Sequence, residues 1–293
     1  MQRENLEENQ FRLVGIRPSP QSPPRQKRKR FQGKPIAAAC FLGLIAAGCL
    51  LCLFVPTRDP SYLDLGHCGE PPGREFLFGT DAMGRDIFAM IWHGGRVSLL
   101  IGAGAAAVSA GIGVLFGAVS GWGPSWLDRL LMRFLEIFLC VPELLLVLFL
   151  QAILGEATVW SIALVIGATS WAGIGKVVRA QVRQLRQSES ILAARAMGGG
   201  FFYLLRKHLI PEFAPSIFFM VVMNIRGAIM AEATLSFLGL GLPLEVISWG
   251  TMLSLAEKAF LTSSWWAVLI PGGFLIVTLL CVTSLGEYFS KRG

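Results

Sequence analysis

The chain has 293 residues, of which 54% are hydrophobic and only 15% are charged, and its formal net charge is +7. Soluble domains usually carry about a quarter charged residues, and a soluble core of this size could not bury so much apolar surface. The composition therefore excludes an ordinary soluble protein and predicts one all-α membrane domain.

The N-terminal residues 1–35 are rich in proline, glutamine and arginine, which predicts a disordered cytoplasmic tail. A basic cluster at 25–30 could indicate nucleic-acid binding, but beside an apolar segment it more often fixes orientation against anionic lipid. We expect membrane lipid and no nucleic acid as a partner. The apolar run 36–55 is long enough to span and has no clear cleavage site. It predicts an uncleaved first transmembrane helix rather than a signal peptide.

Residues 56–96 are predicted to form an extracytoplasmic loop that ends in an interfacial helix, whose apolar face includes Ile87 and Trp92. The remainder, 97–293, contains five more apolar segments that could each cross a bilayer as a helix. These segments are 97–121, 134–154, 157–175, 215–240 and 265–285. The sequence therefore predicts about six transmembrane helices.

Lysine and arginine tend to mark the cytoplasmic side of a membrane protein. With the N-terminus inside, twenty of the 26 lysines and arginines fall on the cytoplasmic side. The reverse orientation would place most of this positive charge outside. The predicted topology therefore has both termini in the cytoplasm.

The cytoplasmic stretch 181–211 is too long for a plain turn. Helix-forming residues fill 181–197, three glycines follow at 198–200, and an amphipathic pattern resumes at Phe201 and ends at Pro211. This pattern predicts two short helices joined at a glycine hinge, an arrangement that suits a docking surface. A flexible loop is the alternative.

Charged residues inside membrane spans are rare and often functional. Four candidates lie in the predicted spans, namely Glu136, Glu143, Arg226 and Glu232. Arg226 and Glu232 are six residues apart, about 240° around a helix, so we do not expect them to pair on one face. Glu143 either lines a path or faces a neighbouring subunit, and Glu232 has either a structural or a gating role.

The motifs that carry enzymatic chemistry are absent from the sequence. It has no G-x-x-x-x-G-K-[ST] phosphate loop, and its three histidines are dispersed along the chain. Five of the six cysteines lie in apolar runs, where a thiol behaves as a small hydrophobic group. We therefore expect no disulfide framework, no metal site, no catalytic residues and no ATPase site in this chain.

The segment LAARAMG at 192–198, followed by Ile210-Pro211, resembles the "EAA" coupling segment of bacterial binding-protein-dependent permeases. Leu192 occupies the position where that family usually has glutamate. In the family this segment lies in a groove of the partner ATPase and transmits its closure to the spans. The resemblance implies this role for Ala193, Ala194, Arg195, Ala196, Gly198 and Pro211, with Arg195 as a charged contact.

Two further runs resemble the dipeptide, oligopeptide and nickel branch of the same family. The first is FGTDAMGRD at 78–86, and the second combines AEATLSFLGLG at 231–241 with SWG at 248–250. Thr80 or Asp81 could cap a helix. The signature residues that the first run contributes are Gly79, Thr80, Asp81, Gly84, Arg85 and Asp86. The resemblance covers about 76–293.

The resemblance implies the permease subunit of an ATP-driven importer with the type I fold, in a bacterial inner membrane. The implied partners are a second homologous permease subunit, two ATPase subunits that bind ATP and Mg, and an extracytoplasmic substrate-binding protein. Relatives in this branch carry peptides, nickel or metal chelates. The alternative is an ion-coupled secondary transporter, a class that tends to show interrupted helices in two repeated halves. No clear repeat is present in this sequence.

Overall fold

The computed structural model of the chain describes residues 36–52, 59–256 and 264–290. The predicted tail 1–35 and the last residues of the predicted first span lie outside this part. Apart from one isolated antiparallel bridge, between Thr80 and Asp86, the regular structure of the described residues is helical. The predicted all-α class is confirmed.

The helices follow one another along the chain with short connections. A one-turn 3-10 helix, η1, covers Leu65–His67, and a π-helical turn, η2, covers Leu205–Leu209. The α-helices are α1 Ile36–Leu51, α2 Ile87–Trp122, α3 Ser125–Cys140, α4 Glu143–Leu154, α5 Val159–Thr169, α6 Ala172–Leu185, α7 Glu189–Ala196, α8 Phe201–Leu204, α9 Ile210–Phe237, α10 Trp249–Ala256 and α11 Trp266–Ser290.

Three helical stretches of the described residues are long and apolar enough to cross a membrane: Ile87–Trp122, Phe201–Phe237 and Trp266–Phe289. Two further spans are possible if each of two bent helix pairs counts as one, α3 with α4 and α5 with α6. The shorter apolar helix α1 is the described part of the predicted first span. The chain is therefore a polytopic membrane protein.

The third predicted span is broken rather than straight. Its two helices, α3 and α4, meet at a bend of 92°. Pro142 lies at this bend and is the N-cap residue of α4. Proline has no N–H to donate, and its ring would clash with the carbonyl group four residues earlier in a continuous helix. The bend at Pro142 therefore follows from the chemistry of proline.

The second predicted span begins ten residues earlier than the sequence suggested. Residues 87–96 form the first turns of α2 rather than a separate interfacial helix. Ile87, Met90 and Ile91 are buried in a cluster with Trp249 and Trp266, so their apolar face packs against protein and not against the membrane interface. With 36 residues, α2 is about 54 Å long and exceeds the hydrocarbon thickness of a bilayer.

Helix α9 begins earlier than its predicted start at 215, and Pro211 does not end the preceding helix as predicted. The chain is helical from Phe201 to Phe237 without interruption. In the π-helical turn the N–H of Ile210 donates to the carbonyl of Leu205, five residues back. The wider turn separates the proline ring from the carbonyl groups that it would otherwise strike, which allows the helix to continue.

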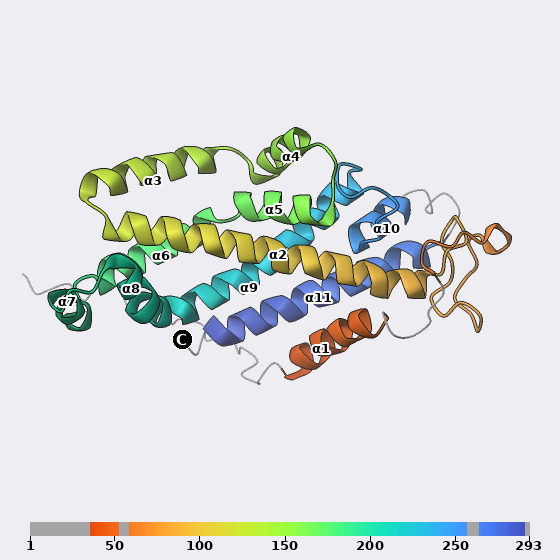
Figure 1. The fold of residues 1–293 in the computed structure, drawn as a ribbon. Coiled ribbons are helices and arrows are strands. Elements are labelled where there is room, and N and C mark those ends of the chain that lie inside the picture. The colour runs from red at the N-terminus through yellow and green to blue at the C-terminus, as the bar shows by residue number, and fades with distance from the viewer. Residues whose placement is uncertain (1–35, 53–58, 257–263, 291–293) are drawn as a thin grey trace, which may run out of the picture. The chain divides into compact units, whose positions relative to one another are not determined.

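Helix α2 is the centre of the arrangement and packs against α5, α6 and α9 (Figure 1). Helices α7 and α8 lie near its C-terminal end, whereas α10 and the loop 59–86 lie near its N-terminal end (Figure 1). We call these the α7 end and the loop end. The predicted docking segment and the predicted extracytoplasmic loop therefore lie at opposite ends of α2.

Glycine allows α2 and α6 to approach closely. A Cβ atom added at Gly117 would lie 2.6 Å from the carbonyl oxygen of Gly175 and 2.7 Å from the Cβ of Val178. Such distances leave no room for a side chain. The close approach of α2 to α6 therefore depends on a small residue at this position.

A buried carboxyl group joins α2, α9 and the start of α10. Glu232 is fully buried and accepts hydrogen bonds from the hydroxyl groups of Ser98 at 3.1 Å, Ser236 at 3.0 Å and Ser248 at 2.7 Å. Ser98 also accepts a hydrogen bond from the backbone N–H of Trp249 at 3.3 Å. This buried site, which we call the Glu232 cluster, therefore connects segments that are far apart in the sequence.

Replacing Gly117 with alanine is expected to destabilise the protein, because the added methyl group would force α2 and α6 apart. Overpacking of this kind costs about 1–3 kcal/mol. The measurement is the thermal unfolding midpoint of the detergent-solubilised protein. Gly111→Ala is the matched control in the same helix, because a Cβ there meets nothing within 4 Å. Equal midpoints for the two variants would contradict the packing argument.

Replacing Glu232 with alanine is expected to lower the same midpoint, because three buried hydroxyl groups lose their common acceptor. Leaving a buried hydroxyl donor without its acceptor costs about 1–3 kcal/mol. Hydrogen exchange of α10 should also become faster. The control is Glu136→Ala, which removes an exposed carboxylate and should change stability by at most about 1 kcal/mol. A variant at Glu232 as stable as this control would show that the cluster is dispensable.

Candidate functional site

Helix α7 is held against the bundle by one face only. Ile191 and Ala194 are 1% and 4% exposed, and Ile191 belongs to a buried cluster with Val182 of α6 and Leu205 of η2. The opposite face carries three exposed residues, Ala193, Ala196 and Met197. A short helix whose outer face carries the small side chains of Ala193 and Ala196 can fit closely into a groove of another protein.

The structure corrects the prediction of one helix over 181–197. Helix α6 ends at Leu185, and a turn at 186–188 separates it from α7. The N–H of Ser188 donates to the carbonyl of Leu185 at 2.8 Å, and the guanidinium of Arg186 donates to the carbonyl of Trp122 at 3.1 Å. The turn is thus attached to the end of α2, and it directs Ile191 into the apolar cluster.

The glycines after α7 form a closed turn. Gly198 has a φ of +85°, which a residue with a side chain rarely adopts. Its N–H donates to the backbone carbonyl of Arg195 at 2.9 Å, and the N–H of Gly199 donates to the backbone carbonyl of Ala194 at 3.0 Å. These two bonds are the Schellman arrangement that ends many helices. The predicted glycine hinge is therefore an ordered helix cap in this structure.

Two ion pairs that sequence reasoning missed share the buried carboxylate of Asp128 near the α7 end. Asp128 of α3 accepts hydrogen bonds from Ser120 at 2.6 Å, from Arg179 Nη2 at 2.7 Å and from Arg183 at 3.1 Å. It therefore ties α2, α3 and α6 together. The arginines are 51 and 55 residues from Asp128 in the chain, so no local pattern could have revealed the contact.

This arrangement can transmit movement. Helix α7 is joined to α6 by a three-residue turn and to α9 by the cap, α8 and η2. Pro211 follows the π-helical turn at the start of α9. Because Ile191 shares one buried cluster with residues of both α6 and η2, a force on the outer face of α7 would act on two helices that lead into the membrane domain.

At the loop end, Thr80 and Gly79 attach the loop to α11. The hydroxyl of Thr80 donates to the carbonyl of His67 at 2.6 Å and accepts from the N–H of Glu70 at 2.8 Å. The indole N–H of Trp266 donates to the carbonyl of Thr80 at 3.1 Å. A side chain at Gly79 would strike the Trp266 ring.

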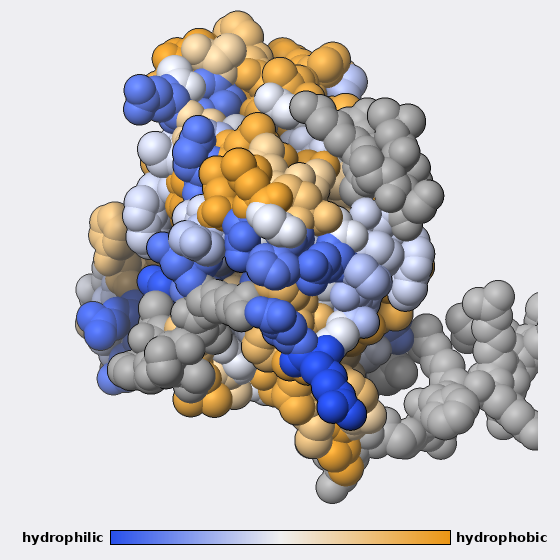
Figure 2. All heavy atoms as spheres, turned by 90° about the vertical axis from the view of Figure 1, so that its right-hand side faces the viewer, coloured by the Kyte–Doolittle hydropathy of each residue, from blue (hydrophilic) through white to orange (hydrophobic). Residues whose placement is uncertain are grey.

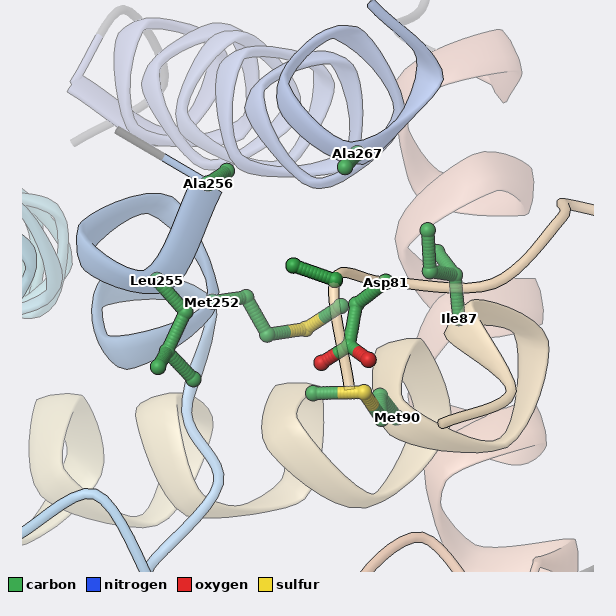
Figure 3. A pocket seen from close by; sticks show the side chains of 8 residues that line it. Asp81, Ile87, Met90, Met252, Leu255, Ala256 and Ala267 are labelled. Carbon is green, nitrogen blue, oxygen red and sulfur yellow. The ribbon is translucent and has the colours of Figure 1, made fainter. Parts of the chain in front are cut away.

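Asp81 and Arg85 are joined to each other by hydrogen bonds in the second half of the signature, residues 81–86. The carboxylate of Asp81 accepts from the backbone N–H of Arg85 at 2.9 Å and from its side-chain Nε at 2.8 Å. Figure 3 shows that the Asp81 side chain points between Met90 of α2 and Met252 of α10. Gly84 has a φ of +76° and lies against the backbone of Asp64.

Asp86, rather than Thr80 or Asp81, caps the helix that follows. Its carboxylate accepts from the N–H of Phe88 at 2.9 Å, at the start of α2. The signature residues thus bind the loop to itself and to the ends of α2 and α11. Seen from the loop end, hydrophilic residues gather across the middle of the surface, with apolar residues above and below (Figure 2).

The four charged candidates in the predicted spans do not form one site. Glu136 pairs with Arg133 at 3.0 Å on an exposed face of α3, and Glu143 accepts from the hydroxyl of Ser170 at 2.7 Å. Arg226 is exposed and its guanidinium donates to the hydroxyl of Thr283 of α11 at 3.5 Å, whereas Glu232 is buried. Arg226 and Glu232 lie on different faces of α9, as predicted.

Residues 113–292, more than half of the chain, match the family described as "Binding-protein-dependent transport system inner membrane component". The oligopeptide transport system permease protein OppC of Bacillus subtilis is 35% identical over 261 residues, which cover 88% of this chain and 85% of that protein. The dipeptide transport system permease protein DppC of the same organism is 35% identical over 74% of this chain and 68% of that protein. OppC of Haemophilus influenzae is 37% identical over 72% of this chain and 67% of that protein.

A solved structure supports the fold independently. It is titled as inward-facing conformations of the MetNI methionine ABC transporter, and the match has a TM-score of 0.55 with 16% identity. It covers 69% of this chain and 95% of that chain. The fold and the sequence relatives therefore agree, and the chain belongs to the family of inner membrane components of binding-protein-dependent transport systems.

Proposed function

We propose that this chain forms one half of a peptide-import pathway and is driven through α7 by separate ATPase subunits. Family membership makes it a multi-pass inner-membrane transport subunit that works with an ATPase and a binding protein and lacks ATPase activity of its own. The ion-coupled secondary transporter is therefore set aside. The finer assembly proposed here has a second homologous permease, two ATPase subunits that bind ATP and Mg, and an extracytoplasmic binding protein.

Peptides are the proposed substrate, rather than nickel or metal chelates. The support comes from the relatives, whose names identify them as oligopeptide and dipeptide permeases at 35–37% identity. The binding protein is proposed to select the peptide. The membrane subunits then supply a passage between them.

The α7 end is proposed to face the cytoplasm, with both chain termini inside. The stretch 176–211, which includes α7, carries seven lysines and arginines, and positive charge favours the cytoplasmic side. The loop end, with its signature residues 79–86, would then face the binding protein. The candidate coupling segment 181–211 would face the ATPase.

The exposed face of α7 carries the coupling proposal. Ala193, Ala196 and Met197 are exposed, whereas Ile191 anchors the other face in a cluster shared with α6 and η2. ATP-driven closure of the ATPase dimer would push on the outer face, and α6 and α9 would carry the movement to the pathway. Differential affinity of ATP for the closed state would supply the bias.

Proline at position 193 is expected to reduce peptide uptake to background. It removes a hydrogen bond in the middle of α7 and costs about 3 kcal/mol in a helix interior. Uptake of a labelled peptide is measured in cells that carry the partner subunits, together with membrane insertion, which should remain normal. Glu189→Pro is the matched control, because position 189 begins α7 and Ser188 already has the extended backbone that precedes proline. Undiminished uptake by Ala193→Pro would refute the coupling role.

The substrate proposal is tested in a strain that lacks its own peptide and nickel permeases. The complete transporter is expected to restore uptake of labelled di- or oligopeptides but not uptake of nickel. Unlabelled peptide should compete with this uptake. Nickel accumulation without peptide accumulation would overturn the proposed substrate class while leaving the coupling proposal intact.

A further inference from the structure

An open basic pocket lies beside α7, at the junction of α2, α6 and α7. Its volume is about 460 Å³. The residues that line it are Gly121, Arg183, Arg186, Gln187, Leu192 and Arg195. Three of these six carry a positive charge and none is acidic, so the described lining strongly favours an anion.

The charge of the pocket is only partly compensated within the described chain. Arg183 pairs with Asp128 at 3.1 Å, but the same carboxylate also pairs with Arg179. Arg186 donates to the backbone carbonyl of Trp122, and Arg195 lies 5.3 Å above the Trp122 ring. Neither contact cancels a charge. Among the described residues, no ion pair is formed by Arg186 or Arg195.

The departure from the family pattern falls in this pocket. Leu192 lines it beside the arginines, at the position where the related coupling segments usually have glutamate. A glutamate here would place a carboxylate among the three arginines. With leucine, none of the described residues that line the pocket supplies a negative charge.

The pocket is on a flank of α7 and not on its outer face. Leu192 and Arg195 are three residues apart and share this flank, whereas Ala193 and Ala196 are exposed on the outer face proposed for the ATPase. Trp126, at the start of α3 and five residues after Gly121 of the lining, is 63% exposed. Tryptophan is enriched at membrane–water interfaces, where its ring lies at the level of the lipid headgroups.

We propose that this pocket binds the phosphate headgroup of an anionic phospholipid from the cytoplasmic leaflet. Guanidinium groups form strong, charge-assisted hydrogen bonds with phosphate oxygens, and basic pockets between membrane helices on the cytoplasmic side suit such headgroups. Leu192 would contact the apolar part of the lipid. The bound lipid would supply a negative charge that the described lining lacks. The location, but not the lipid chemistry, rests on the proposed function.

The test uses the full-length chain in its complex with its partner subunits, purified in detergent. Phosphatidylglycerol or phosphatidylcholine is titrated, and bound lipid is counted by native mass spectrometry. Phosphatidylglycerol is expected to bind roughly tenfold more tightly, and Arg186→Gln or Arg195→Gln should each weaken its binding roughly tenfold. Arg133→Gln, which alters an exposed arginine of α3 outside the pocket, should have no effect.

Position 192 provides a second comparison that leaves the arginines intact. Leu192→Glu should weaken phosphatidylglycerol binding because it supplies an internal carboxylate, whereas Leu192→Gln, of the same size and uncharged, should not. Unchanged binding in the arginine variants and in Leu192→Glu would overturn the proposal. Displacement of the lipid by equimolar inorganic phosphate would show a free-anion site instead.

The partner subunits offer the other possible source of negative charge. If the arginine variants lose the ATPase subunits while lipid binding is unchanged, the pocket holds a carboxylate of the partner, and the lipid proposal is wrong. Lipid binding is measured without transport. Failure of peptide uptake would therefore overturn the proposed function and leave the lipid result standing.

Discussion

A bilayer interior contains no water to satisfy buried polar groups, so the Glu232 cluster has to satisfy itself. Three serine hydroxyl groups from separate segments converge on one carboxyl group. Because the hydroxyl of Ser98 also accepts a hydrogen bond from the backbone N–H of Trp249, the cluster fixes the start of α10 on α2. The indole of Trp249 then donates to the carbonyl of Ile91 at 3.0 Å and packs in the cluster that holds the loop end together. The Glu232 cluster therefore holds the start of α10 on α2 at the loop end.

The two ends of α2 are built on different principles. At the loop end, the backbone of a compact loop is closed by its own polar side chains and by the indole of Trp266. At the α7 end, the apolar cluster around Ile191 and the ion pairs of Asp128 hold short helices against long ones. The first arrangement is suited to a fixed outer surface. The second leaves a small helix exposed and firmly attached, as a coupling element requires.

Apolar length and the distribution of lysine and arginine were sufficient to predict a helical, polytopic fold. These properties are local. The contact of Ser98 with Glu232 joins residues 134 positions apart, and no local pattern specifies it. Pro211 was misread because its effect depends on the π-helical turn before it, which propensity does not reveal. The position of α7 was recognisable, but its separation from α6 required the contact of Arg186 with Trp122.

The cap after α7 has a mechanical consequence. Three consecutive glycines would ordinarily make a compliant joint, and a stroke delivered to a compliant joint is dissipated by bending. Here two hydrogen bonds close the turn, and Ile191 clamps the short helix to its neighbours. In the proposed coupling, this link would be stiff, and a displacement on one side of it would arrive on the other with little loss of amplitude.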